Sequence, residues 1–437
     1  MFKLIVIADD FTGALDTGVQ FSKAGVPTFV CTDLHLPNLG QYAHIEVLVL
    51  DLETRHLPPD RAYALVQEAA TLAARMGIPY IYKKTDSGMR GNIGSELDGL
   101  FLDDTQEPVA FVPAYPATER ITKQGTHYWN GTPISQTVFG KDPFNPVLDD
   151  YIPDIIARQT QRRTTVVPIG ALGEINTQNH PGEILVFDAT SDREMAQVAN
   201  TLAACTPPRL MAGCAGFAKY LPDMLQLARR TPHTETAPQH EGLLIASGSI
   251  NSVTLAQLQY AMGSGFQVLT LTPAQKLTPN FPHTQEGKHF LHLMVQAYQA
   301  TKRLIIPAAI DAESITHTNQ LARDMGLDLE AARRRVASNM GQLIGQFLEQ
   351  VPINTFAVFG GDTLISVIRA IGAEGIYPVQ EVESGIVHST LVYKNASIHL
   401  ISKSGGFGSR ESVLAIDKYL KNTLAPTNFR TEEKTYA

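Results

Sequence analysis

The chain has 437 residues and a mass of 47.7 kDa, which at about 150 residues per domain predicts two or three domains. With 35 basic and 43 acidic side chains its formal net charge is −8, and this acidity argues against a general nucleic-acid-binding protein. An apolar content of 44% in a chain of this length allows a large core and excludes disorder for the bulk of the chain.

The cysteines and the N-terminal residues point to a soluble protein. The three cysteines are far apart and form no CxxC pair, so they predict neither a zinc knuckle nor a disulfide framework. The apolar run Leu4–Ala8 is too short for a signal peptide and is followed at once by two aspartates. No stretch approaches the ~20 apolar residues that a membrane helix needs. We expect a cytoplasmic protein that has neither a membrane nor a nucleic acid as partner.

Short apolar runs alternate with helical patterns through the first half of the chain. The predicted strands are Leu4–Ala8, Thr28–Cys31, Val47–Leu50, Tyr80–Tyr82 and Val109–Val112, and the predicted helices are Gly13–Lys23, Pro59–Met76 and Ile93–Leu102. From residue 114 to 150 the pattern gives way to a polar stretch rich in Pro and Gly, whose length is typical of a functional or locally folded insertion. The alternation then resumes at 164–168, 183–187, 193–204, 210–211 and 217–227.

A second unit of the same kind follows a polar segment without periodicity. We predict a first domain at 1–230, a linker at 231–241, a second domain at 242–424 and a polar tail at 425–437. The second domain has apolar runs or helical patterns at 243–246, 268–271, 303–306, 321–350, 355–359, 385–393, 397–401 and 411–420. Strand–helix alternation of this kind predicts an α/β protein whose two domains each hold a mostly parallel sheet flanked by helices.

Two adjacent carboxylates, Asp9 and Asp10, come directly after the first predicted strand. Open α/β sheets bind their ligands at the carboxyl ends of the strands. Carboxylates there can hold sugar hydroxyls, bind a metal or act as a base. The alternative is an acidic helix N-cap with a solvated neighbour.

A denser mixture of charges follows another strand, within residues 82–92. Lys83, Lys84 and Arg90 suit a carboxylate or phosphate, whereas Asp86 suits hydroxyl groups, so the segment predicts a site for an anionic, hydroxylated ligand. Arg55 follows a third strand and could hold a carboxylate through two parallel hydrogen bonds. Its alternative is a surface arginine paired with Glu53.

Three glycine-bearing turns follow predicted strands in the second half, at residues 246–252, 359–363 and 402–408. Backbone N–H groups in such turns can cradle phosphate oxygens at a helix N-terminus, although each turn alone could be an ordinary connector. None of them is a Walker A or a GxGxxG motif. Together they predict a nucleotide site in the second half. A kinase is the simplest enzyme that needs both this site and the site for a small anionic polyol in the first half.

Four stretches of the sequence resemble the four-carbon acid sugar kinase family: 7–14 (IADDFTGA), 83–87 (KKTDS) with 90–92 (RGN), 360–363 (GGDT) and 403–408 (KSGGFG). The resemblance covers nearly the whole chain in the expected order. It implies an N-terminal sugar-acid-binding domain, a C-terminal nucleotide-binding domain and ATP-dependent phosphorylation of a tetronate at its terminal hydroxyl. D-threonate is the implied substrate, with D-erythronate and 3-oxo-tetronates as alternatives.

The resemblance also assigns residues. The implied substrate-binding residues are Asp9, Arg55, Lys83, Lys84, Thr85 and Asp86. The implied nucleotide-binding residues are Ser249, Ser252, Gly360, Gly361, Asp362, Thr363, Gly405 and Gly406, although the contact within the serine-rich turn stays open among Ser247, Ser249 and Ser252.

For the reaction, we expect Arg55, Lys83 and Lys84 to fix the substrate carboxylate. Asp9 and Asp86 would orient the hydroxyls, one of them accepting the proton of the attacking hydroxyl. Mg²⁺ would bridge the ATP phosphates, with Asp10 or Asp362 as its candidate protein ligand.

Two other classes remain open from the sequence alone. One is a sensor that binds a sugar acid and a nucleotide without turnover. The other is a metal-dependent aldolase or dehydratase that uses the paired aspartates. A homodimer is common among cytosolic enzymes of this size, but no interface can be read from the sequence.

Overall fold

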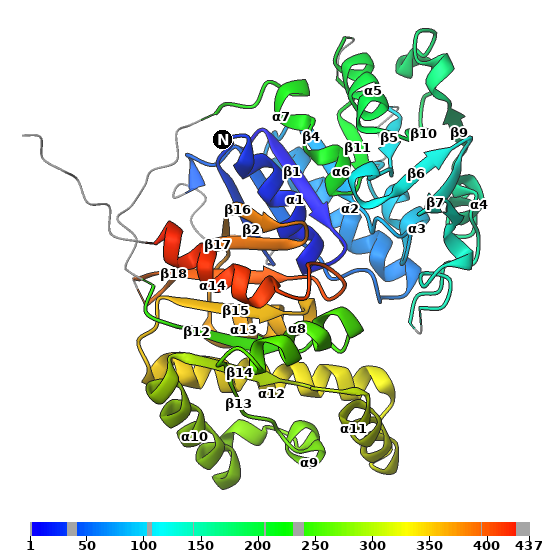
Figure 1. The fold of residues 1–437 in the computed structure, drawn as a ribbon. Coiled ribbons are helices and arrows are strands. Elements are labelled where there is room, and N and C mark those ends of the chain that lie inside the picture. The colour runs from blue at the N-terminus through cyan, green and yellow to red at the C-terminus, as the bar shows by residue number, and fades with distance from the viewer. Residues whose placement is uncertain are drawn as a thin grey trace, which may run out of the picture. The chain divides into compact units, whose positions relative to one another are not determined.

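The computed structural model describes residues 2–32, 42–102, 107–142, 144–204, 207–229, 240–394 and 396–424 (Figure 1). The chain forms two compact units, one of Met1–Thr231 with Glu374–Glu381 and one of Pro232–Ala373 with Val382–Ala437. Residues 231–239 of the predicted linker and the predicted tail at 425–437 lie outside the described residues. No helix within the described ranges is long and apolar enough to cross a membrane.

The first unit is built on a sheet of parallel strands in the order β2-β3-β1-β4-β11-β5-β10-β9. Its strands are β1 (Leu4–Ala8), β2 (Thr28–Cys31), β3 (Val47–Asp51), β4 (Tyr80–Lys84), β5 (Val109–Val112), β9 (Thr164–Val167), β10 (Ile184–Phe187) and β11 (Leu210–Gly213). Its helices are α1 (Phe11–Lys23), α2 (Pro59–Arg75), α3 (Ile93–Asp98), α4 (Ile152–Ala157), α5 (Asp192–Ala204), α6 (Ala215–Ala218) and α7 (Leu221–Met224). The predicted α/β class is confirmed.

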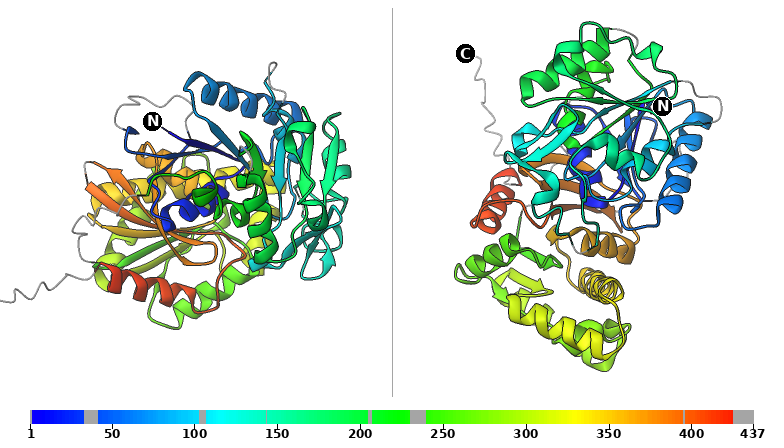
Figure 2. Two further views of the ribbon diagram at one scale, coloured as in Figure 1. Left: turned by 90° about the horizontal axis from the view of Figure 1, so that it is seen from above. Right: turned by 90° about the vertical axis from the view of Figure 1, so that its right-hand side faces the viewer.

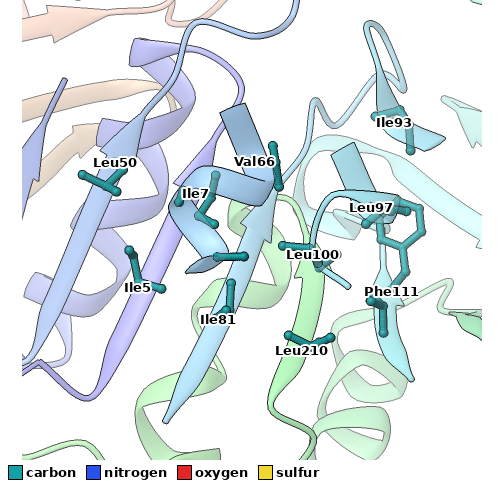
Figure 3. Packing of buried hydrophobic residues seen from close by; sticks show 14 of the residues in the cluster. Ile5, Ile7, Leu50, Val66, Ile81, Ile93, Leu97, Leu100, Phe111 and Leu210 are labelled. Atoms are coloured by element: carbon teal, nitrogen blue, oxygen red, sulfur yellow. The ribbon is translucent and has the colours of Figure 1, made fainter. Parts of the chain in front are cut away.

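One face of this sheet packs against α2 and α3. Ile5 and Ile7 alternate along β1 toward this face, where they meet Val66 of α2 in one buried cluster (Figure 3). Helix α2 begins with Pro59 in its first turn, where a backbone N–H would have no partner within the helix, so the proline costs no hydrogen bond. It ends before Gly77, which has a positive φ of 64°.

The stretch from 114 to 150 is a locally folded insertion, one of the two interpretations that its length allowed. It contains a small antiparallel sheet of β6 (Arg120–Lys123), β7 (Thr126–Trp129) and β8 (Thr132–Pro133). An antiparallel bridge between Thr122 and Ala189 joins it to the segment after β10. The insertion therefore has a fixed conformation of its own.

The second unit has a mostly parallel sheet, in which β13, β14, β12, β15, β18 and β17 lie side by side in that order. These strands are β12 (Leu243–Ser247), β13 (Gln267–Val268), β14 (Arg303–Pro307), β15 (Thr355–Phe359), β17 (Ile386–Tyr393) and β18 (Ala396–Lys403). The helices are α8 (Ser252–Met262), α9 (Pro273–Leu277), α10 (Gln285–Thr301), α11 (Ala312–Asp324), α12 (Leu329–Gln350), α13 (Gly361–Ile371) and α14 (Ser412–Thr423). Helices α8 and α14 bury their apolar sides against one face of the sheet, and Figure 2 gives two further views of these elements.

Two details of the second unit refine the sequence prediction. The helical region at 321–350 is two helices, because Gly326 adopts a positive φ of 71° and Asp328 caps a new helix by accepting a hydrogen bond from the N–H of Ala331. The two apolar runs near the C-terminus form adjacent antiparallel strands, β17 and β18, as predicted.

One segment of the chain's second half packs with the first unit. Residues Glu374–Glu381 include most of β16 (Tyr377–Glu383), and they cover the edge strand β2. Val30 and Ile376 exchange two backbone hydrogen bonds of 2.8 Å each, and the ring of Tyr377 lies 5.0 Å from that of Phe29. This segment blocks further strand pairing at that end of the sheet.

Candidate functional site

The predicted sugar-acid motifs converge because three strands end at the same height. Ala8 pairs with Asp51 on one side and with Lys84 on the other, so the residues that follow β1, β3 and β4 emerge at one edge. We call the side chains gathered there the charged cluster. It consists of Asp9, Asp10, Arg55, Lys84, Asp86 and Arg90.

Asp9 is held by two cations and is only 1% exposed. Its Oδ2 accepts a hydrogen bond of 2.7 Å from Nε of Arg55, and its Oδ1 lies 3.3 Å from Nζ of Lys84. Burial tends to raise the pKa of Asp9, but the attraction of Arg55 and Lys84 outweighs it and holds that pKa well below its usual range. Asp9 is therefore an ionised acceptor at neutral pH.

Asp10 has a different role, because it caps helix α1. Its side chain accepts hydrogen bonds from the N–H of Gly13 (3.1 Å) and from the hydroxyl of Thr12 (2.7 Å), which confirms the N-cap interpretation for this residue. Nη2 of Arg55 also lies 2.6 Å from Asp10. A Cβ at Gly13 would clash with Nζ of Lys84, so glycine at this position lets the lysine approach the helix start.

Asp86 and Arg90 form the second strong pair of the cluster. Nε and Nη2 of Arg90 donate to the two carboxylate oxygens of Asp86 at 2.8 and 3.0 Å, and the backbone N–H groups of Gly88 and Arg90 add further bonds. Burial raises the pKa of Asp86, but Arg90 and Arg55 lower it well below the usual range. Arg90 also donates from Nη1 to Asp142, at 3.1 Å.

Lys83 and Lys84 point in opposite directions, as successive residues of a strand must. Nζ of Lys83 is fully enclosed, 3.0 Å from Oε2 of Glu96 and 2.7 Å from the carbonyl oxygen of Lys84. Glu96 in turn accepts from the hydroxyl of Thr54. Lys84 thus joins the charged cluster, whereas Lys83 belongs to an ion pair in the protein interior.

Thr85 is also buried, and its backbone N–H donates to the carbonyl oxygen of Gly213. Its hydroxyl has no hydrogen-bond partner among the described residues.

The insertion contributes residues that the sequence patterns did not reveal. Asp142 binds Arg90, and the ring of Phe139 lies 5.2 Å from the guanidinium carbon of that arginine. His127 is fully buried between the hydroxyl of Thr122 (3.0 Å) and the carbonyl oxygen of Ser87 (3.1 Å). Burial lowers the pKa of His127 to about 4, so the ring is neutral. A signal for these residues existed only in the unusual length of the insertion.

The second unit brings the three glycine turns together at the carboxyl ends of β12, β15 and β18, where Phe359 pairs with both Ser247 and Lys403. Gly360 has a positive φ of 102°, and a Cβ there would lie 3.1 Å from the backbone nitrogen of Ser249. Helix α13 starts from Gly360, a residue without a side chain to cap it, so the N-cap residue itself accepts no hydrogen bond from the first N–H groups of the helix.

Each predicted nucleotide-binding residue can be placed in these turns. The three turns come closest together at Ser249, Gly360, Thr363 and Gly405. A Cβ added at Gly248 would collide with the side chain of Thr363, and one added at Gly405 would collide with that of Ser249. Gly361 and Asp362 form the first turn of α13, Ser252 is the exposed first residue of α8, Gly406 is exposed, and Ser247 is buried.

Lys403 ties these turns together from within. Its Nζ donates to the carbonyl oxygens of Ser404, Gly405 and Phe407 at 3.0 to 3.2 Å, and to the hydroxyl of Thr254 at 3.1 Å. The residue is 1% exposed, and burial lowers its pKa to about 8. The ammonium group thus fixes the backbone of the 404–408 turn.

Comparison with known protein families identifies the family of this chain. A family model for a sugar-binding N-terminal domain matches residues 4–221, and one for a nucleotide-binding C-terminal domain matches residues 244–413. The chain is also 30% identical over 419 residues to the D-threonate kinase of Salmonella typhimurium, covering 93% of this chain and 96% of that protein. The chain belongs to the four-carbon acid sugar kinase family.

Other members of the family match over similar lengths. The D-threonate kinase of Bordetella bronchiseptica is 26% identical, covering 94% of this chain and 95% of its own. The D-erythronate kinase of Heliobacterium modesticaldum is 22% identical, covering 99% and 100%. A solved structure from Salmonella typhimurium LT2, 23% identical, superposes with a TM-score of 0.79 over 96% of this chain and 100% of that one, which supports the fold.

The interior position of Lys83 generates a stability prediction. Replacing it in Lys83→Met leaves Glu96 buried without its cation, and we expect the free energy of unfolding to fall by about 3 kcal/mol. In the double variant Lys83→Met/Glu96→Gln, which removes both charges, we expect most of this loss to be recovered. Urea-induced unfolding measures both. A single variant of wild-type stability with a raised KM for the sugar acid would instead place Lys83 against the substrate.

The titration of Lys403 predicts that stability and activity change with pH in opposite directions. Since its folded pKa of about 8 lies below the ordinary value of 10.5, the unfolded chain binds more protons between these values, so the free energy of unfolding should rise there with pH. Over the same range kcat/KM for ATP should fall, because the amine loses a proton that holds the 404–408 turn.

The variant Lys403→Met serves as the control for both profiles. Its stability and its kcat/KM for ATP should lack these two pH-dependent changes. Identical profiles for the wild type and this variant would show that Lys403 does not titrate in this range.

Proposed function

We propose that this chain is an ATP-dependent kinase that phosphorylates the terminal (4-) hydroxyl of D-threonate to give 4-phospho-D-threonate. The observation that carries the proposal is the charged cluster, in which two ionised carboxylates are fixed by cations at the ligand-binding edge of the first sheet. The similarity to two D-threonate kinases favours this substrate. D-erythronate and 3-oxo-tetronates are the alternatives, since kinases named for them also match.

Asp9 and Asp86 carry the chemistry in this proposal. Both are ionised, so both can accept hydrogen bonds from substrate hydroxyls and hold the attacking oxygen in line with the transferred phosphoryl group. Their low pKa values make them weak bases. Phosphoryl transfer tolerates weak bases, because its loose transition state depends mainly on positioning and charge neutralisation.

ATP is assigned to the glycine turns of the second unit. The N–H groups at the start of α13 and the turns fixed by Lys403 offer donors for phosphate oxygens. This arrangement supports the assignment of Ser249, Gly360, Thr363 and Gly405 to the nucleotide.

Mg²⁺ would neutralise phosphate charge in this reaction. Among the described residues there is no group of three or more His, Cys, Asp or Glu side chains that could cage a metal. Mg²⁺ does not require one, because it binds through one or two carboxylates together with waters and substrate phosphates. Asp362 fits this role, since its side chain is 42% exposed beside the glycine turns, although Nε of Arg333 lies 3.3 Å from its Oδ2. Asp10 fits less well, because it caps α1 and pairs with Arg55.

The proposal is tested by measuring ADP release from Mg²⁺-ATP with D-threonate, D-erythronate, their L-forms and 3-oxo-tetronates in parallel. We expect the highest kcat/KM for D-threonate. ATP and tetronate binding without ADP from any compound would favour the sensor. Consumption of a sugar acid without ATP would favour the aldolase or dehydratase.

Asp86 is tested separately by the variant Asp86→Asn. We expect kcat to fall by about 10²- to 10⁴-fold, because the attacking hydroxyl loses its charged acceptor. KM should change far less. Asp142→Asn is the matched control, since Asp142 pairs with the same Arg90 but is less buried. Turnover of Asp86→Asn near the wild-type rate would remove Asp86 from the catalytic role.

A further inference from the structure

The cations of the charged cluster are already matched by protein carboxylates. Arg55 and Lys84 each lie within ion-pairing distance of both Asp9 and Asp10. Arg90 is shared between Asp86 and Asp142. These cations hold the carboxylates in place, so an anionic substrate group would have to compete with two or more internal ion pairs to reach any of them.

Arg120, the first residue of β6, has no such partner. It is 9% exposed, and no carboxylate of the described residues lies within the 4.0 Å of an ion pair. Its Nη1 donates to the carbonyl oxygen of Thr118 at 3.2 Å, whereas its buried Nε has no hydrogen-bond partner within the described part of the chain. A guanidinium in this state is unusual, because a buried charge is costly unless it is paired.

The side chains of Arg120 and Arg90 lie against the same aromatic ring. The guanidinium carbon of Arg120 lies 5.3 Å from the centre of the Phe139 ring, and the same ring lies 5.2 Å from that of Arg90. The indole of Trp129 lies 5.8 Å away. Tyr115 fixes the backbone of Arg120 through two hydrogen bonds.

The electrostatics place Arg120 in the field of the cluster. Burial lowers the pKa of Arg120, and the attraction of Asp86 raises it while the repulsion of Arg90 lowers it further. Asp16 on α1 attracts it as well, but from beyond ion-pairing distance. The guanidinium therefore lacks an anion at a position where a ligand could supply one.

We propose that Arg120 binds the carboxylate group of the sugar acid. This inference rests on the proposed function and adds the residue that recognises the acid. A guanidinium can offer two parallel N–H donors to a planar carboxylate. Arg55, Lys84 and Arg90 then serve to orient Asp9 and Asp86 toward the hydroxyl groups.

The test compares Arg120→Gln, Arg120→Lys and the wild type. In Arg120→Gln we expect KM for the sugar acid to rise about 10- to 100-fold, with KM for ATP unchanged within twofold. Arg120→Lys keeps the charge but loses the fork, so its KM for the acid should lie between the other two. Arg163→Gln, at an exposed arginine of the same unit, is the control and should behave as wild type.

A second measurement does not depend on turnover. Without ligand, Arg120→Gln should unfold at the same temperature as the wild type or higher, because it removes an unpaired buried charge. The sugar acid should raise the unfolding temperature of the wild type, and this rise should be absent in Arg120→Gln.

The outcomes separate the two proposals. If no tetronate is phosphorylated by the wild type or raises its unfolding temperature, the proposed function fails, regardless of the result for the Arg120 variants. If the wild type is active and Arg120→Gln raises both KM values equally, or unfolds at a lower temperature without ligand, Arg120 is structural and the inference fails. An unchanged KM for the acid in Arg120→Gln also overturns it.

Discussion

The ion pair between Asp9 and Arg55 joins the ends of β1 and β3 at the site, and the geometry of the charged cluster depends on it. Both side chains are largely withdrawn from water, so each would be strongly disfavoured alone. Lys84 adds a third strand end to the same contact. The consequence is that two carboxylates are ionised and fixed before any ligand arrives, which is the preorganisation that electrostatic catalysis requires.

In the second unit a buried cation, Lys403, holds polar groups in place. Lys403 places an ammonium group inside the 404–408 turn, where three backbone carbonyl oxygens accept its hydrogen bonds. The carbonyl groups of Ser404, Gly405 and Phe407 face inward to the lysine. In the first unit cations position carboxylates, whereas in the second a cation positions the backbone. Both units use burial to make a few polar contacts strong.

Much of this could be predicted from the sequence, because the rule that parallel sheets bind at strand ends needs only strand positions. Asp9, Arg55, Lys84 and Asp86 each follow a recognisable apolar run, and the register brings them together. Alternation along a strand shows that Lys83 and Lys84 face opposite sides of the sheet, but it does not say which of them joins the charged cluster.

The rest could not be predicted, because it depends on contacts between segments without periodicity. Arg120, His127 and Asp142 come from the insertion, whose strands are short and polar, so nothing in their spacing marks their neighbours. The break at Gly326 was readable in principle, since a glycine followed by an aspartate cap is a common helix boundary. The pairing of Ile376 with Val30 joins residues that lie far apart in the sequence, and no local pattern marks it.

Because of the segment Glu374–Glu381, the chain cannot be cut between its two family domains without separating packed residues. The family match to the nucleotide-binding domain runs from 244 to 413 and therefore contains residues whose packing partners belong to the sugar-binding unit. A chain truncated after residue 231 would leave β2 as an open edge and would uncover Phe29. Exchange of the nucleotide-binding half with that of another kinase would replace this strand as well. The two units have separate buried clusters, yet a segment of the second half of the chain is part of the first unit.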